Sequence, residues 1–168
     1  MKRKRFLSLL VVLTFATLAD AKVSVNFDET VDFAEYKTYA WHKGTPAADT
    51  LIQSHIENAI NDQLGTRGLS KTADQPDMYV VVHVTTKENK QVIDSWLGYD
   101  SKSGHWGRHK QMTTVEVGTL MVDLLDGKSK KLVWRGVATK TLEPRPKNPK
   151  KTIDKIVARM FRRFPPRK

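Results

Sequence analysis

Residues 113–141 read TTVEVGTLMVDLLDGKSKKLVWRGVATKT, and this stretch decides the fold. Apolar and polar side chains alternate through residues 113–125, which is typical of a β-strand with one buried face. The Asp-Gly pair at 126–127 predicts a turn, and residues 131–141 return as a partner strand with Trp134 among its apolar positions. The stretch therefore predicts a long antiparallel hairpin.

Four other segments also carry strand patterns, namely residues 22–27, 38–41, 77–86 and 91–97. Residues 78–84, MYVVVHV, form a nearly continuous β-branched run, which is typical of a central strand covered on one face or on both. Residues 98–110 are interrupted by glycines and predict an irregular loop. Strands joined in this way through turns predict an antiparallel sheet.

Two amphipathic helices are predicted. In residues 50–64 the apolar side chains recur at helical spacing, and an Asp-Thr pair at 49–50 can cap the first turn. Residues 149–164 carry a wide apolar stripe after an Asn-Pro pair at 148–149 that suits a helix start. Since two such helices can cover one sheet face, we expect an α+β two-layer sandwich: an antiparallel sheet of about five or six strands with two amphipathic helices on one face.

Residues 1–21 have the parts of a secretory signal peptide: a basic start, an uncharged apolar run and a small-x-small site formed by Ala19 and Ala21. We expect cleavage after Ala21, so that Lys22 begins a single domain of residues 22–168. The alternative is an uncleaved anchor, but the apolar run is shorter than the roughly 20 residues that a membrane span requires. The sequence has no cysteine for lipid attachment, so we expect an exported periplasmic protein without a lipid anchor.

Charge is distributed unevenly along the chain, which carries a formal net charge of +11. Residues 22–126 hold 10 basic and 15 acidic side chains, whereas residues 127–168 hold 15 basic and 2 acidic ones. Such an asymmetry suggests an electrostatic function or charge complementarity within the molecule. Removal of the basic signal segment and a periplasmic location both argue against nucleic acid as a partner.

The second predicted helix carries the most specific functional pattern. Lys151, Lys155, Arg159 and Arg162 recur at helical spacing away from the apolar stripe, and Arg163 extends the set. We expect this basic face to bind another envelope component, an unknown protein partner; an anionic polymer or membrane surface is the alternative partner. A solvated outer face that the acidic half partly neutralises is the non-functional alternative.

Catalytic patterns are missing from the sequence, which contains neither a Gly-x-Ser-x-Gly elbow nor a glycine-rich phosphate loop. His105 and His109 have the spacing of a helical ligand pair, but the surrounding glycines argue against a helix. We therefore expect no enzymatic activity, no metal and no cofactor; a metal-dependent or hydrolytic enzyme that uses the 98–110 loop is the alternative. Trp106, in the same loop, is a candidate contact for a ligand or partner.

Three motifs resemble a known family. Residues 32–41, DFAEYKTYAW, resemble the opening of the domain-of-unknown-function family DUF4136, and residues 118–136, with VDLLD in the first strand and WRG in the second, resemble its hallmark hairpin. The ending FPP at 164–166 is similar as well. The resemblance implies an exported bacterial envelope protein without an assigned activity, and it supplies no catalytic residues.

Overall fold

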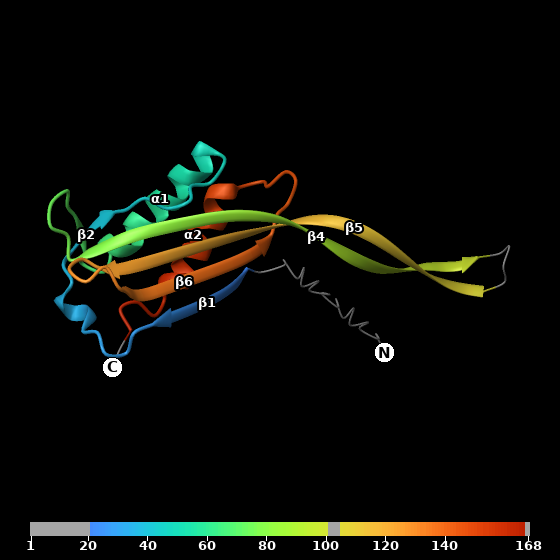
Figure 1. Ribbon diagram of the computed structural model, residues 1–168. Coiled ribbons are helices and arrows are strands. Elements are labelled where there is room, and N and C mark those ends of the chain that lie inside the picture. Colours follow the sequence, from blue (N-terminus) through green and yellow to red (C-terminus); the bar gives the residue numbers. More distant parts are fainter. Residues whose placement is uncertain (1–20, 101–104, 167–168) are drawn as a thin grey trace, which may run out of the picture.

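The computed structural model of the protein describes residues 21–100 and 105–166. Within them lie six strands in one sheet, with the order β1-β6-β5-β4-β2-β3, and two α-helices. Both helices pack on the same face of the sheet (Figure 1). The elements are β1 (Lys22–Phe27), β2 (Thr38–Trp41), α1 (Thr50–Gly65), β3 (Ser70–Lys71), β4 (Met78–Asp100), β5 (His105–Asp126), β6 (Leu132–Thr141) and α2 (Pro149–Phe161), with a 3-10 turn at Phe33–Glu35.

The α+β prediction is confirmed, and so is the placement of both helices. The sheet is mixed rather than wholly antiparallel, because β2 runs parallel to β4 and to β3. The helix α1 lies between β2 and β4 in the chain. This helical crossover returns the chain to the end of the sheet where β2 began, so β4 runs parallel to β2. The other pairings, β1 with β6, β6 with β5 and β5 with β4, are antiparallel.

The prediction of an irregular loop at residues 98–110 is wrong. The strands β4 and β5 pair continuously from Met78↔Asp126 to Asp100↔His105, so the hairpin extends through most of this region. The register shifts once, between Trp96 and Tyr99, where two residues of β4 stand opposite one of β5. Gly98 lies in this bulge, and glycine inside a strand often marks a bulge. Gly98 therefore accommodates an irregularity within the strand instead of ending it.

The outer part of this hairpin has no neighbouring strand. The pairing of β5 with β6 ends at Val117↔Thr141, and that of β4 with β2 covers only Met78 to Val80. We call residues 88–100 and 105–116 the arm; in Figure 1 it extends away from the helices and the sheet. At about 3.3 Å per residue the β4 half of the arm is about 43 Å long.

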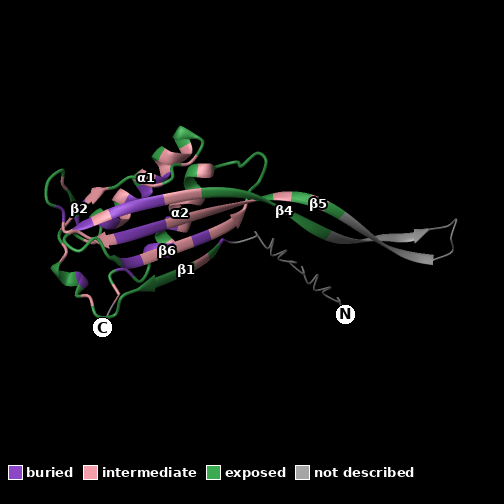
Figure 2. Cartoon of the chain, viewed as in Figure 1, coloured by how far each residue is buried: buried purple, intermediate pink, exposed green. Residues whose placement is uncertain are grey.

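The core lies between the helices and the inner part of the sheet, as the distribution of buried residues in Figure 2 shows. Trp134 on β6 packs against Phe161 on α2, with ring centroids 4.9 Å apart. Gly136 permits this approach, since a Cβ there would lie 2.6 Å from the Trp134 ring and 2.8 Å from Met160 Sδ. The largest fully buried side chains are those of Trp134, Phe161, Ile60, Leu64, Met78, Leu124, Met160, Val80, Val122 and Val157.

Both predicted helix caps are present. Asp49 Oδ1 accepts hydrogen bonds from the backbone N–H groups of Leu51 and Ile52. Asn148 Oδ1 accepts one from the N–H of Lys151. Each cap satisfies backbone donors that the first turn of a helix leaves without a partner.

The predicted signal peptide lies almost wholly outside the described residues, and so does Ala19 of the predicted cleavage site. Ala21 is buried, and Lys22 begins β1. Among the described helices, none is long and apolar enough to cross a membrane.

Candidate binding site

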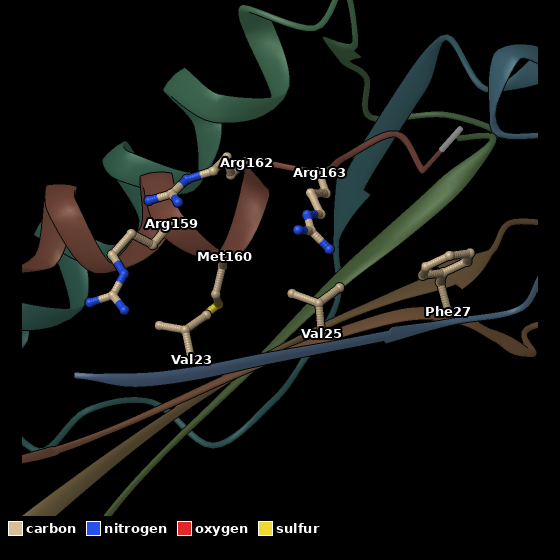
Figure 3. A pocket seen from close by; sticks show the side chains of 7 residues that line it. All are labelled: Val23, Val25, Phe27, Arg159, Met160, Arg162 and Arg163. Carbon is tan, nitrogen blue, oxygen red and sulfur yellow. The ribbon is translucent and has the colours of Figure 1, made fainter. Parts of the chain in front are cut away.

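A groove of about 320 Å³ lies between β1 and the carboxyl-terminal end of α2. Three apolar side chains of β1 form its floor, and three arginines line the side made by α2 and the residues after it (Figure 3). Met160 lies between the two groups. The lining residues are Val23, Val25, Phe27, Arg159, Met160, Arg162 and Arg163.

The floor belongs to an edge strand. In the described sheet β1 is the outermost strand and pairs with β6 alone. Its alternation places Val23, Val25 and Phe27 on the helix side, yet the end of α2 does not cover them fully: Val25 and Phe27 are each 37% exposed. An apolar floor that is open to solvent can contact a partner's apolar side chains.

The backbone of the same residues faces the free edge. The N–H of Asp28 donates to Val133 C=O at 2.9 Å, which makes residue 28 part of a hydrogen-bonded pair with β6. Since hydrogen-bonded and non-hydrogen-bonded pairs alternate in an antiparallel ladder, the backbone groups of Val23, Val25 and Phe27 point away from β6. In agreement, the N–H of Phe27 donates to its neighbour's side chain, Asn26 Oδ1, at 3.0 Å.

The arginines lie on a helix end that α1 holds in place. The guanidinium of Arg67, which follows α1, donates to the carbonyl oxygens of Phe161 at 2.5 Å and of Phe164 at 2.7 Å. Phe161 is the last residue of α2, and its carbonyl oxygen also accepts the backbone N–H of Phe164 at 3.0 Å, so Arg67 binds the turn that ends the helix. Burial lowers the pKa of Arg67 below its ordinary value, and its side chain also donates to the carbonyl oxygen of Gln63. Arg159, Arg162 and Arg163 are thus presented on a fixed scaffold.

The structure divides the predicted basic face into two parts. Arg159, Arg162 and Arg163 come together at the groove, whereas Lys151 and Lys155 are exposed earlier on α2 and do not line it. Within the described residues, no ion pair joins these two lysines, Arg162 or Arg163 to a carboxylate; the ion pairs found are Arg135–Asp123, Lys140–Glu143 and Lys150–Asp154. The described carboxylates of the acidic half therefore do not neutralise these four cations by direct contact.

The contribution of β1 to the groove was missed from sequence. The alternating pattern of residues 22–27 predicts a strand with one apolar face, and that face exists. The sequence pattern does not indicate that β1 is an edge strand or that α2 ends above it, because both depend on the pairing of β1 with β6, more than 100 residues away in the chain.

Trp106, the other predicted contact residue, lies on the arm. Its backbone pairs with that of Tyr99 near the distal end of the hairpin, and its side chain lies outside the described part of the structure. The structure therefore does not bring Trp106 together with the arginines of α2 (Figure 1).

The predicted histidine pair also lies on the arm. His105 and His109 are both on β5, paired with Asp100 and Ser95. Four residues along a strand span about 13 Å, whereas four along a helix span only about 6 Å. Among the residues that the structure describes, no three His, Asp or Glu side chains lie close enough together to hold a metal ion.

Polar groups of residues 32–41, the DFAEYKTYAW motif, make contacts that stabilise the fold. Asp77 Oδ2 accepts hydrogen bonds from the N–H groups of Lys37 and Thr38, and the first of these is the largest cause that lowers the Asp77 pKa. Burial, and then the nearby carboxylate of Asp126, raise the pKa of Tyr36 to about 12; its hydroxyl donates to Asp126 Oδ2 at 3.2 Å. These groups fix the chain before β2 to the ends of β4 and β5.

A comparison with family models finds one family over nearly all of the described chain. The model described as "Domain of unknown function (DUF4136)" matches residues 23–166. No curated protein matches the chain in sequence.

Two solved structures share the fold at low sequence identity. A PDZ domain protein from Parabacteroides distasonis is 16% identical with a TM-score of 0.60; the match covers 89% of this chain and 37% of that protein, so the chain spans well under half of its length. A PelC dodecamer from Paraburkholderia phytofirmans is 11% identical with a TM-score of 0.55, and the match covers 88% of this chain and 99% of the PelC chain. At these identities the likeness shows the fold alone.

Proposed function

Because the chain belongs to the DUF4136 family, a domain of unknown function, we propose a role from its site: it is a non-enzymatic binding protein of the bacterial cell envelope. It is exported, and its signal peptide is cleaved after Ala21. It binds an acidic envelope component in the groove between β1 and α2. One observation carries the proposal, namely that Arg159, Arg162 and Arg163 stand above the exposed apolar side chains of Val25 and Phe27.

The composition of the groove supports a partner with both charged and apolar groups. Arginine forms planar, bidentate hydrogen bonds with carboxylates and phosphates. An open apolar floor next to these cations favours a partner that also brings apolar side chains, which distinguishes a protein from a simple polyanion. Arginine and aromatic side chains are also enriched at protein interfaces.

The packing of α2 argues against insertion of this helix into a membrane. Val157, Met160 and Phe161, which form its apolar stripe, are buried against the sheet. An interfacial helix needs that stripe for the lipid. The polar face of α2 remains for contact, and the exposed Lys151 and Lys155 on it keep an anionic polymer or membrane surface as the alternative partner.

The proposal is tested by charge reversal within the groove and outside it. We expect envelope proteins captured by the exported chain to be lost with the Arg162→Glu, Arg163→Glu variant and retained with Lys151→Glu, Lys155→Glu, which changes the charge equally. Equal capture by both variants would contradict a role for the groove. Intact-mass measurement of the periplasmic protein tests the location, since a mass that still includes residues 1–21 would contradict cleavage after Ala21.

A further inference from the structure

We infer that the groove binds its partner by strand addition: an extended segment pairs with the free edge of β1 and places acidic side chains, alternating with polar ones, beneath the arginines of α2. This inference rests on the proposed function and adds the conformation and the sequence pattern of the partner. It follows from two properties that the same three residues, Val23, Val25 and Phe27, have at once.

The first property is the direction of their backbone groups. The N–H and C=O groups of Val23, Val25 and Phe27 point to the free edge, as the Asp28–Val133 hydrogen bond and the β1–β6 register establish. Such an edge can template another chain, and recognition by strand addition obtains affinity from these main-chain hydrogen bonds. A six-residue strand accommodates a segment of about five to seven residues.

The second property is the direction of their side chains, which line the groove. Residues directly opposite each other on paired strands project to the same face, with Cβ atoms about 4.5–5.5 Å apart. Partner side chains opposite these three residues therefore enter the groove, and every second partner side chain does so. Backbone pairing and side-chain recognition thus use the same edge.

The chemistry of the groove selects what those side chains are. Arg159, Arg162 and Arg163 favour carboxylates, and the exposed floor at Val25 and Phe27 favours an apolar group between them. The expected segment alternates small polar residues with acidic and apolar ones, for example Thr-Glu-Thr-Val-Thr-Glu-Thr. The arginines that recognise this segment belong to the basic residues that the sequence predicted as a binding face. The sequence did not predict the edge strand beneath them.

A second copy of the chain is a poor occupant of the same edge. Pairing of two β1 edges about a two-fold axis would place both groups of three arginines on the same face of the joined sheet. Like charges brought together at an interface are destabilising. We therefore assign the site to an acidic segment of another protein.

The experiment measures binding of fluorescent Thr-Glu-Thr-Val-Thr-Glu-Thr to the protein by anisotropy, with N-methylated forms of the peptide as probes of backbone pairing. In antiparallel addition, the backbone N–H groups of the Glu and Val residues face β1, whereas those of the Thr residues face away. We expect N-methylation of the first set to weaken binding at least about tenfold and methylation of the second set to have little effect; the reverse pattern would indicate parallel addition. Equal effects of the two sets would overturn strand addition, while binding that still depends on Arg162 and Arg163 would leave the proposed function standing.

A matched pair of protein variants tests the edge from the other side. Val25→Pro removes an N–H that points away from β6, a position that proline can occupy on an edge strand; Val25→Ala retains this N–H. We expect binding to weaken at least about tenfold more in the proline variant than in the alanine variant. Equal binding by two folded variants would overturn the inference, and if the proline variant does not fold, the methylated peptides decide alone.

Two further results would also count against the inference. Polyphosphate or vesicles rich in anionic lipid that bind through Arg162 and Arg163, with no binding of the peptide, would assign the groove to a phosphate-bearing surface. A concentration-dependent dimer in sedimentation that the Val25→Pro variant abolishes would assign the edge to a second copy.

Discussion

Arg135 holds the carboxylate of Asp123 with two hydrogen bonds, since Nε lies 2.6 Å from Oδ1 and Nη2 lies 2.6 Å from Oδ2. The two residues are directly opposite in the β5–β6 register, and the Asp123 carboxylate is buried while the arginine is partly exposed. Between Trp134, which packs into the core, and Gly136, which admits α2, Arg135 projects to the opposite face. The WRG motif therefore has a structural explanation in all three positions.

Removal of either member of this pair is expected to destabilise the protein. Asp123→Ala should lower the free energy of unfolding by about 1.5–3 kcal/mol, the usual contribution of hydrogen bonds to charged groups. A double-mutant cycle with Arg135→Ala, measured by denaturant unfolding, isolates the coupling. Lys150→Ala provides the control, because its pair with Asp154 is exposed to solvent and contributes little to stability. Additive effects of Asp123→Ala and Arg135→Ala would contradict the pairing.

Glycine is required at position 136 by packing. A Cβ there would lie within 2.6 Å of the Trp134 ring and 2.8 Å of Met160 Sδ, so Gly136→Ala should lower the free energy of unfolding by about 1–3 kcal/mol. Gly65→Ala is the matched control: it is the last residue of α1 and no atom lies near the added Cβ, so the substitution should leave stability unchanged or raise it slightly. Thermal unfolding of the two variants measures the difference, and equal midpoints would be the contrary result.

Acid unfolding is expected to depend on Asp77. Its pKa is lowered in the folded protein by hydrogen bonds from the backbone N–H of Lys37 and from Thr38. A lowered folded pKa means that the carboxylate stabilises the fold above the ordinary value of 3.8 and that this contribution disappears as the pH falls through the folded value. Asp77→Asn should therefore be less stable at neutral pH and lose less stability on acidification. Parallel stability–pH curves for the two proteins would contradict this role.

The elements with local signals could be predicted from sequence. The pattern of residues 113–141 indicates the β5–β6 hairpin, and the capping residues Asp49 and Asn148 mark the helix starts, because each depends on neighbours in the chain. The basic residues of α2 were also found in this way. Their division was not, because Arg162 lines the groove while Lys151 does not, and only the position of β1 beneath the helix end distinguishes them.

The arm shows why other parts could not be predicted. Residues 87–90, KENK, are polar throughout, which is typical of a turn, and yet they continue β4. Alternation of apolar and polar residues arises where one face of a strand is covered. Beyond the inner sheet no described strand or helix covers β4 and β5, so their pattern disappears although their pairing with each other continues.

Removal of the arm should leave the fold intact. Among the side chains that the structure describes, the core cluster contains none from the arm, and Val92 and Met112, which pair across it, are 58% and 68% exposed. Replacement of residues 91–113 by Asn-Gly would join Lys90 to Thr114, a pair that already stands opposite in the register, through a favoured hairpin turn. We expect little change in the thermal midpoint and unchanged binding of the acidic peptide. A loss of peptide binding would assign the site to the arm, and thus to the region of Trp106, instead of the groove.

Arg67 is expected to connect stability to binding. Its guanidinium donates to Phe161 and Phe164 carbonyls and so fixes the end of α2 beside the groove. Arg67→Met retains much of the side-chain volume but removes these donors, which should cost about 1.5–3 kcal/mol of unfolding free energy. Because Arg162 and Arg163 then stand on a looser helix end, the affinity for the acidic peptide should fall as well, although Arg67 does not line the groove.

Arg67→Lys is the control variant, because it keeps the charge but cannot reach both carbonyls with the same planar geometry. Its stability and its affinity should lie between those of the unchanged protein and of Arg67→Met. Unfolding and anisotropy measurements on the same samples test the connection, and a destabilised Arg67→Met variant with unchanged affinity would show that the groove does not depend on this anchor.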